Sequence, residues 1–203
     1  MNHRIYSILF LFLLGSGLRS YGQDTLPAKR TGIYFGINVG TWFPDGRNKV
    51  LGHPLLAGVT LGLRADRNAY ALNFDLIGIG VNSTKEPVVI TSGDSTVTQD
   101  DYSGMQFTFD YSRELWRWKR MAVEGLCGIG YGRLSYYNPD KDTDVYKGSF
   151  VLSPGVSLRW LLGRKYFVQL KAQYCVADYR LRDNTSTDFS GNYIITKLVF
   201  GGQ

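Results

Sequence analysis

Hydrophobic and polar residues alternate along much of this chain, beginning at Ile33. From Ile33 to Phe43, one set of alternate positions is apolar (Ile33, Phe35, Ile37, Val39 and Phe43), and the intervening positions are mostly small or polar. A period of two indicates a β-strand with one apolar face. The second face suits either solvent or the crowded interior of a barrel.

Seven further runs follow the same pattern. They cover residues 55–64, 70–76, 102–112, 121–137, 149–160, 166–176 and 194–200. Asp66, Arg67 and Asn68 read as a tight hairpin turn between two of the runs. The alternation shifts phase after Leu76, which predicts a β-bulge near Gly78. Pro154 lies on an apolar face and would remove one hydrogen bond from its ladder.

The connections between the runs alternate between long and short. The long ones, residues 44–54, 83–101, 138–148 and 182–191, follow the first, third, fifth and seventh runs. A membrane meander with both termini in the periplasm has this arrangement, with its long loops outside the cell. The sequence therefore predicts an all-β fold, an eight-stranded antiparallel up-and-down transmembrane β-barrel.

The apolar face of the predicted barrel carries aromatic residues near both ends of its strands. We expect these residues to form the two girdles that mark the bilayer interfaces. The periplasmic girdle would contain Tyr70, Tyr111, Trp160, Tyr166 and Phe200, and the outer girdle Phe43, Tyr131 and Phe150.

The opposite phase of the alternation places charged residues inside the barrel. These residues are Arg64, Asp75, Asp110, Glu124, Arg159, Lys171 and Lys197. The interior of an eight-stranded barrel is just wide enough for side chains, and an unpaired buried charge is costly. We therefore expect a plug of paired charges rather than a conducting pore.

The first residues have the three parts of an export signal: basic Arg4, an apolar run from Ile5 to Leu14, and small or polar residues up to Gly22. The apolar run is too short to span a membrane as a helix. We therefore divide the chain into a cleaved signal peptide (1–22), a short N-terminal segment (23–32) and an outer-membrane barrel (33–203).

The composition agrees with a barrel and with few other classes. The chain has 24 glycines, and 14 tyrosines with 11 phenylalanines. Loss of Arg4 and Arg19 with the signal leaves 21 basic against 17 acidic residues, so the net charge falls from +6 to +4. The remaining basic residues are scattered rather than gathered on one face, which argues against nucleic-acid binding.

With these features, the mature chain resembles the small eight-stranded outer-membrane β-barrel proteins of Gram-negative bacteria, the outer membrane protein beta-barrel domain family. The resemblance is architectural and rests on no diagnostic motif. Members of that family usually end in an aromatic residue that assists assembly, whereas here Phe200 is followed by Gly201, Gly202 and Gln203. The resemblance implies outer-membrane lipids, lipopolysaccharide and the barrel-assembly machinery as partners.

Some barrels of this kind are enzymes that act on the acyl chains of lipopolysaccharide, but no catalytic set is evident here. His53 has no adjacent serine to activate. Asp140, Asp142 and Asp144 have the spacing that opens a calcium loop, but the later ligands are missing. Cys127 and Cys175 fall on opposite faces of their strands, which predicts two free thiols. We expect no catalytic residue, no metal and no cofactor.

Three functions remain open. The leading hypothesis is a non-enzymatic outer-membrane protein that has a structural role in the envelope or binds a partner through its loops. A narrow porin-like channel, or an accessory component of a secretion or transport system, is the first alternative. A soluble lipocalin-like barrel is the second, and it would reverse the polarity of the two faces.

Overall fold

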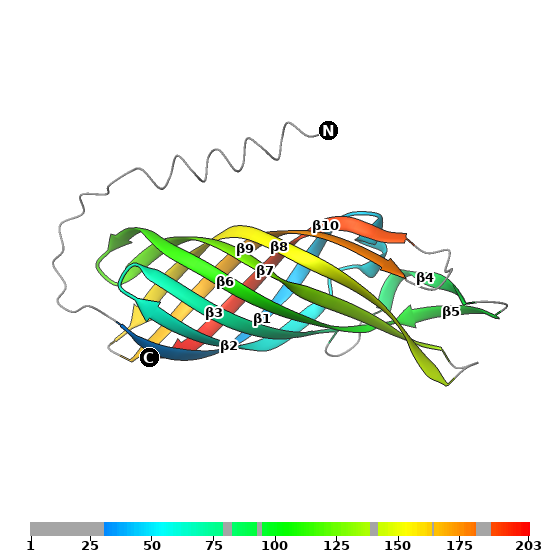
Figure 1. Ribbon diagram of the computed structural model, residues 1–203, viewed down its shortest axis with the longest axis horizontal. Helices are drawn as coiled ribbons and strands as arrows, with labels where there is room; N and C mark the ends of the chain where they lie inside the picture. The colour runs from blue at the N-terminus through cyan, green and yellow to red at the C-terminus, as the bar shows by residue number, and fades with distance from the viewer. Residues whose placement is uncertain (1–30, 79–82, 93–94, 139–141, 164, 182–187) are drawn as a thin grey trace, which may run out of the picture.

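Eight strands close into one barrel in the computed structural model, which describes residues 31–78, 83–92, 95–138, 142–163, 165–181 and 188–203 (Figure 1). The barrel strands are β1 (Gly32–Gly46), β2 (Leu55–Ala65), β3 (Asn68–Ile77), β6 (Ser103–Trp118), β7 (Met121–Asn138), β8 (Thr143–Leu162), β9 (Tyr166–Leu181) and β10 (Asp188–Gly202). The predicted fold class is confirmed. The predicted signal peptide lies outside the described residues.

Each barrel strand pairs antiparallel with the barrel strand before it, and β1 closes the sheet against β10. The closing register runs from Phe35 opposite Gly202 to Gly46 opposite Gly191. Closure pairs both edges of the sheet, which leaves no barrel edge for another chain to extend. Among the described residues, no helix has the length and apolar character needed to span a membrane.

Tight turns join the strands at the end of the barrel where β1 begins and β10 ends (Figure 1). The predicted turn between β2 and β3 is confirmed, and Asp66 has φ 59° there. Lys119 has φ 50° in the turn between β6 and β7. Two-residue hairpin turns need such left-handed positions to match the twist of their strands.

Several strands are longer than their apolar patterns predicted. Strand β6 continues six residues beyond Ser112 to Trp118, and its register against β7 shifts between Glu114 and Trp116, as at a β-bulge. Most of the predicted loop 138–148 belongs to β7 and β8. Strand pairing continues there because backbone hydrogen bonds form whether or not a side chain is apolar.

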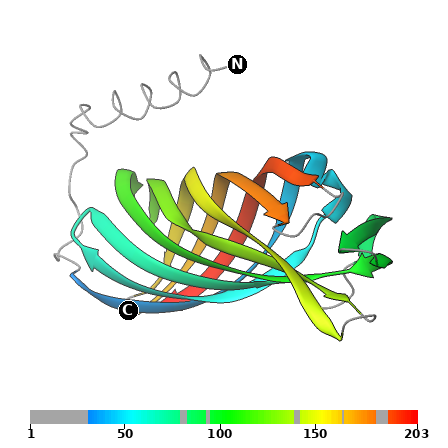
Figure 2. The same ribbon diagram turned by 45° about the vertical axis from the view of Figure 1, so that its right-hand side comes forward.

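The predicted loop 83–101 is also ordered into strands. It contains a hairpin of β4 (Ser83–Ser92) and β5 (Ser95–Asp101), which forms a separate two-stranded sheet at the end of the barrel opposite the C-terminus (Figure 2). The connection between β1 and β2 contains a short 3₁₀ helix, η1 (Arg47–Leu51), at that end as well. We call this the loop end of the barrel and the opposite one the turn end.

The prediction of a β-bulge near Gly78 is wrong for the described residues. Ile77 keeps the phase of β3 and is buried inside the barrel, and the strand ends there with Gly78 at φ 87°. The change of phase in the sequence therefore reflects the end of the strand, and Ile79 and Val81 lie outside the described residues.

Pro154 interrupts the ladder without changing the register. Strand β8 pairs with β9 at Leu152 opposite Val176 and again at Gly155 opposite Gln173, with no pair formed at Ser153 or Pro154. Proline has no N–H to donate. Strand β7 still pairs with this segment, with Cys127 opposite Pro154, so the register is kept across the gap in the β8–β9 ladder.

Candidate functional site

The interior of the barrel contains all seven charged residues that the alternation places there. Each is at most 5% exposed, and each comes from a different barrel strand, β1 being the strand that contributes none of them. Four are basic and three acidic. They are Arg64, Asp75, Asp110, Glu124, Arg159, Lys171 and Lys197.

Glu124 is the centre of the network near the turn end. Its carboxylate accepts a hydrogen bond from the Arg64 guanidinium at 2.8 Å and lies 3.3 Å from that of Arg159. The Gln169 amide donates to it at 2.8 Å, and the Ser157 hydroxyl at 3.2 Å. Two guanidinium groups and two neutral donors therefore compensate for the desolvation of one carboxylate.

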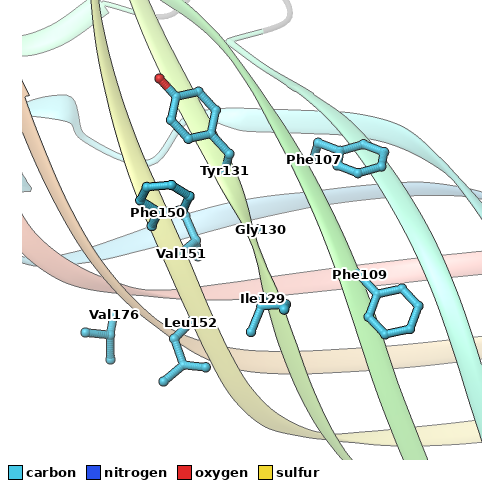
Figure 3. A pocket seen from close by; sticks show the side chains of 9 residues that line it. All are labelled: Phe107, Phe109, Ile129, Gly130, Tyr131, Phe150, Val151, Leu152 and Val176. Carbon is cyan, nitrogen blue, oxygen red and sulfur yellow. The ribbon is translucent and has the colours of Figure 1, made fainter.

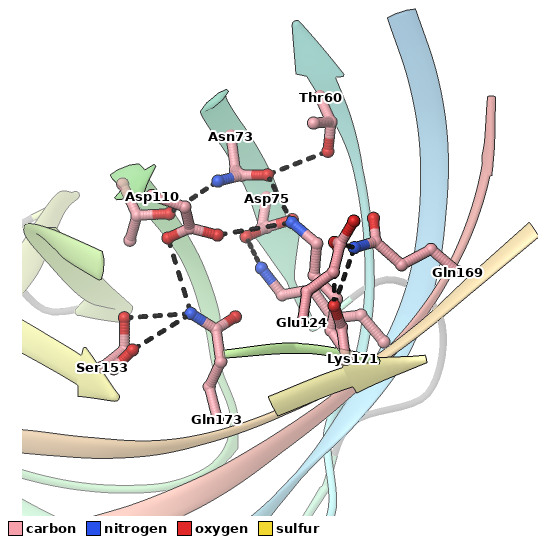
Figure 4. A network of polar contacts seen from close by, with 12 residues as sticks. Thr60, Asn73, Asp75, Asp110, Glu124, Ser153, Gln169, Lys171 and Gln173 are labelled. Carbon is pink, nitrogen blue, oxygen red and sulfur yellow. Dashed lines mark hydrogen bonds and ion pairs between the residues drawn. The ribbon is translucent and has the colours of Figure 1, made fainter. Parts of the chain in front are cut away.

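A second network lies next to the first, farther toward the loop end. The Lys171 ammonium is 3.3 Å from the Asp110 carboxylate (Figure 4). The Lys197 ammonium pairs with Asp75. Gln173 donates to Asp110 at 3.4 Å. Neutral hydrogen bonds continue the network, with Thr60 donating to Asn73 at 2.9 Å.

The alternation missed two buried charges. Glu114 is 8% exposed, pairs with Arg117 and lies 3.6 Å from Arg159. It was missed because the pattern predicted that its strand ends at Ser112. Lys147 is fully buried on β8, in a segment that was predicted to be a loop. Both would have been predicted if the expected strands had been extended beyond their apolar runs, as backbone hydrogen bonding extends them in the structure.

Buried aromatic side chains fill the interior at the loop end. Trp42 stacks on Tyr193 with a centroid distance of 4.2 Å, and Tyr136 stacks on Phe189 at 5.5 Å. The Lys147 ammonium lies 5.2 Å from the Phe189 ring centroid. The larger cluster also includes Leu51, Leu56, Ile77, Tyr102, Leu134, Val151, Cys175, Ala177, Tyr179 and Ile195.

Tyr102, between β5 and β6, fastens this cluster to the connection after β1. Its hydroxyl donates to the backbone oxygen of Leu51 at 2.7 Å. Burial raises the pKa of this hydroxyl well above its usual range. The contact holds η1 over the loop end of the barrel interior.

A smaller apolar cluster fills the turn end. Tyr34 packs edge-on against Phe167 with a centroid distance of 5.7 Å. Ala69, Ala71, Leu161 and Val199 complete the cluster. The described interior therefore contains an apolar layer toward each end as well as the charged networks.

The outer face of the barrel is apolar along its strands. Tyr111 is the one predicted girdle residue that is half-buried. The other seven are more than one-third exposed: Phe43, Tyr70, Tyr131, Phe150, Trp160, Tyr166 and Phe200. Several of them pair across strands, such as Tyr166 stacked on Phe200 at 6.1 Å. Trp116 and Trp118 are also exposed at the turn end, and they were missed because their strand was predicted too short.

The other candidate residues are not brought together. The Nδ1 atom of His53 lies 2.9 Å from the backbone oxygen of Trp42, which is a structural contact. The prediction of two free thiols is confirmed. Asp140 lies outside the described residues. Within the part of the chain that the structure describes, no group of three or more His, Cys, Asp or Glu side chains is placed to hold a metal ion.

Comparison with known proteins adds the class to which this fold belongs. No family model and no curated protein matches the sequence. Among solved structures, neisserial surface protein A matches with a TM-score of 0.59 and 10% identity, over 84% of this chain and 94% of that one. The fold is therefore that of the small eight-stranded outer-membrane β-barrels.

A second match has the same architecture. The Yersinia pestis attachment invasion locus protein Ail, solved with the heparin analogue sucrose octasulfate, has a TM-score of 0.50 and 13% identity, over 85% of this chain and 96% of that one. At these identities the likeness extends to the fold.

Proposed function

We propose that this protein is a non-enzymatic barrel of the bacterial outer membrane whose closed interior anchors surface loops that contact the envelope or an extracellular partner. The observation that carries the proposal is the combination of an apolar exterior with a paired, charged interior. A soluble lipocalin-like barrel would have the opposite polarity. Water would make this exterior costly, whereas a bilayer would stabilise it.

The loop end supports the second half of the proposal. The connection between β3 and β6 carries the separate β4–β5 sheet, and η1 covers part of the same end. The turn end, by contrast, has tight turns such as the one at Asp66 and Arg67. Structural elaboration at one end only is typical of barrels whose loops carry function. Ail was solved with a sulfated saccharide analogue bound, which supports loop-mediated binding here.

The orientation can be tested by labelling intact cells with a membrane-impermeant maleimide. Thr98→Cys places a thiol at an exposed position of β5, and Arg67→Cys places one in an exposed turn at the opposite end. We expect Thr98→Cys to react on intact cells, and Arg67→Cys to react after permeabilisation of the outer membrane. The reverse pattern would contradict the proposal.

A channel is the competing function, and planar bilayers separate it from a closed barrel. Buried charge pairs and two apolar layers fill the described interior, so we expect flat current traces after insertion of the purified protein. Stepwise conductance from single molecules would show that the interior opens. The proposal would then give way to a narrow pore.

A further inference from the structure

An apolar groove lies on the outer surface of the barrel near the loop end. Its volume is about 560 Å³, and its lining is almost wholly apolar. Phe107 and Phe109 stand on one side, Phe150 and Leu152 on the other, and Ile129 lies between them on β7 (Figure 3). The volume lies within the range of roughly 300–1,000 Å³ that is usual for ligand pockets.

Tyr131 forms the upper wall of the groove, the wall toward the loop end. Its ring packs edge-on against Phe150 at 5.8 Å. Its hydroxyl lies over Gly148, where an added Cβ would be only 1.8 Å away. Glycine at this position therefore lets the Tyr131 ring lie across the sheet. Phe150 stands away from the sheet and is 85% exposed.

Arg133 is the next outward-facing residue after Tyr131 along β7. Its guanidinium stacks over the Tyr146 ring, 4.0 Å from the centroid. Its Nε is buried and has no hydrogen-bond partner among the described residues, and none of the ion pairs found there involves Arg133. The Tyr146 ring therefore holds the Arg133 cation in place, and no described residue forms an ion pair with it.

We propose that Arg133 and the groove together bind an anionic lipid of the outer leaflet whose phosphate is not balanced by a cation of its own headgroup, with that phosphate on the guanidinium and one acyl chain in the groove. This inference rests on the proposed orientation, which puts the loop end at the cell surface. The groove is continuous with the bilayer-facing surface, so an acyl chain reaches it without leaving the membrane. Guanidinium groups bind phosphate oxygens through paired hydrogen bonds.

The test is native mass spectrometry of the full mature chain in detergent, with bisphosphorylated lipid A as the anionic probe and phosphatidylcholine as the zwitterionic one. Arg133→Gln removes the charge, and we expect lipid A binding to weaken about tenfold or more, as for loss of a hydrogen bond to a charged group. Arg113→Gln is the matched control. Arg113 is an exposed arginine on the outward phase of the neighbouring strand, at the turn end.

Filling the groove tests the acyl chain separately from the phosphate. Val176→Trp and Leu152→Trp each place a large ring in the groove, and we expect both to weaken lipid A binding severalfold. Leu198→Trp is the control, because Leu198 is an equally outward-facing residue on β10, away from the groove. Using two filling variants keeps the test decisive if one of them does not fold.

Heat-dependent electrophoretic mobility confirms that each variant is folded before its binding is compared. Equal lipid A binding by Arg133→Gln and Arg113→Gln would overturn the site, as would equal binding by the filled variants and Leu198→Trp. Phosphatidylcholine binding as tight as that of lipid A would also overturn it. Failure of the wild-type chain to fold into detergent or bilayers would instead count against the proposed function itself.

Discussion

Arg64 of β2 and Glu124 of β7 meet inside the barrel, with 2.8 Å between the guanidinium Nη2 and the carboxylate Oε1. Two barrel strands, β3 and β6, separate β2 from β7 in the sheet, so this ion pair crosses the interior rather than joining neighbours. Arg159 of β8 reaches the same carboxylate. The pair thereby links distant parts of the wall and helps to fix the shape of the closed sheet.

Replacing Glu124 with glutamine should destabilise the barrel strongly. The substitution leaves Arg64 and Arg159 as buried cations without their main partner, and breaking a buried pair costs about 3–5 kcal/mol. Urea unfolding in lipid vesicles measures the change in the free energy of unfolding, with the loss of heat-dependent electrophoretic mobility as the readout. Asp66→Asn in the exposed turn should alter stability by less than about 0.5 kcal/mol. Equal effects of both substitutions would contradict this role for Glu124.

Lys197 and Asp75 should show strong energetic coupling. Lys197→Met or Asp75→Asn alone leaves one buried charge unpaired, whereas the double variant removes both charges. A double-mutant cycle should therefore give a coupling of about 1–3 kcal/mol. The exposed pair of Lys49 and Asp45, 3.6 Å apart, is the control. Its coupling should stay below about 1 kcal/mol, and similar values for the two pairs would argue against a buried interior network.

A charge on the outer face should cost more at mid-membrane depth than at the rim. Val156 lies on β8 about midway between the girdle residues Phe150 and Trp160, and Leu162 lies just beyond Trp160. Val156→Arg should cost about 2–4 kcal/mol in vesicles and Leu162→Arg about 0–1 kcal/mol. Urea midpoints measure both. Two equally harmless substitutions would indicate a face exposed to water.

Gly62 should tolerate no side chain. A Cβ at this position would lie 2.2 Å from the Tyr34 ring, which packs edge-on against Phe167. Gly62→Ala should lower the free energy of unfolding by about 1–3 kcal/mol through overpacking. Gly32→Ala is the control, since nothing lies within 4 Å of a Cβ built there. Unchanged stability of Gly62→Ala would show that the turn end is loosely packed.

The sequence predicted which side chains face inward, because successive residues of a strand point to opposite faces. The alternation from Ile33 to Phe43 was sufficient to predict the strand β1, and the apolar face shared by the strands was sufficient to predict the barrel class. The partners of the buried charges were not predicted. They depend on the stagger between strands, so the contact of Arg64 with Glu124 could not be derived from positions along one strand.

Strand ends were predicted poorly for a related reason. Apolar alternation indicates only the part of a strand whose outer face is apolar. Backbone pairing extends farther, since β7 and β8 remain paired as far as Asn138 and Thr143. Tyr179 and Phe189 lie in such extensions of β9 and β10, beyond the predicted ends of their strands. The aromatic layer at the loop end was therefore missed although each of its residues was visible in the sequence.

The apolar outer face is what should hold this barrel in a membrane. Fractionation of cells that express the full chain, followed by electrophoresis with and without boiling, tests it most directly. We expect recovery in the outer-membrane fraction and a different mobility for the unboiled protein, because such a barrel stays closed in detergent. Recovery of folded protein in the soluble periplasmic fraction would contradict it.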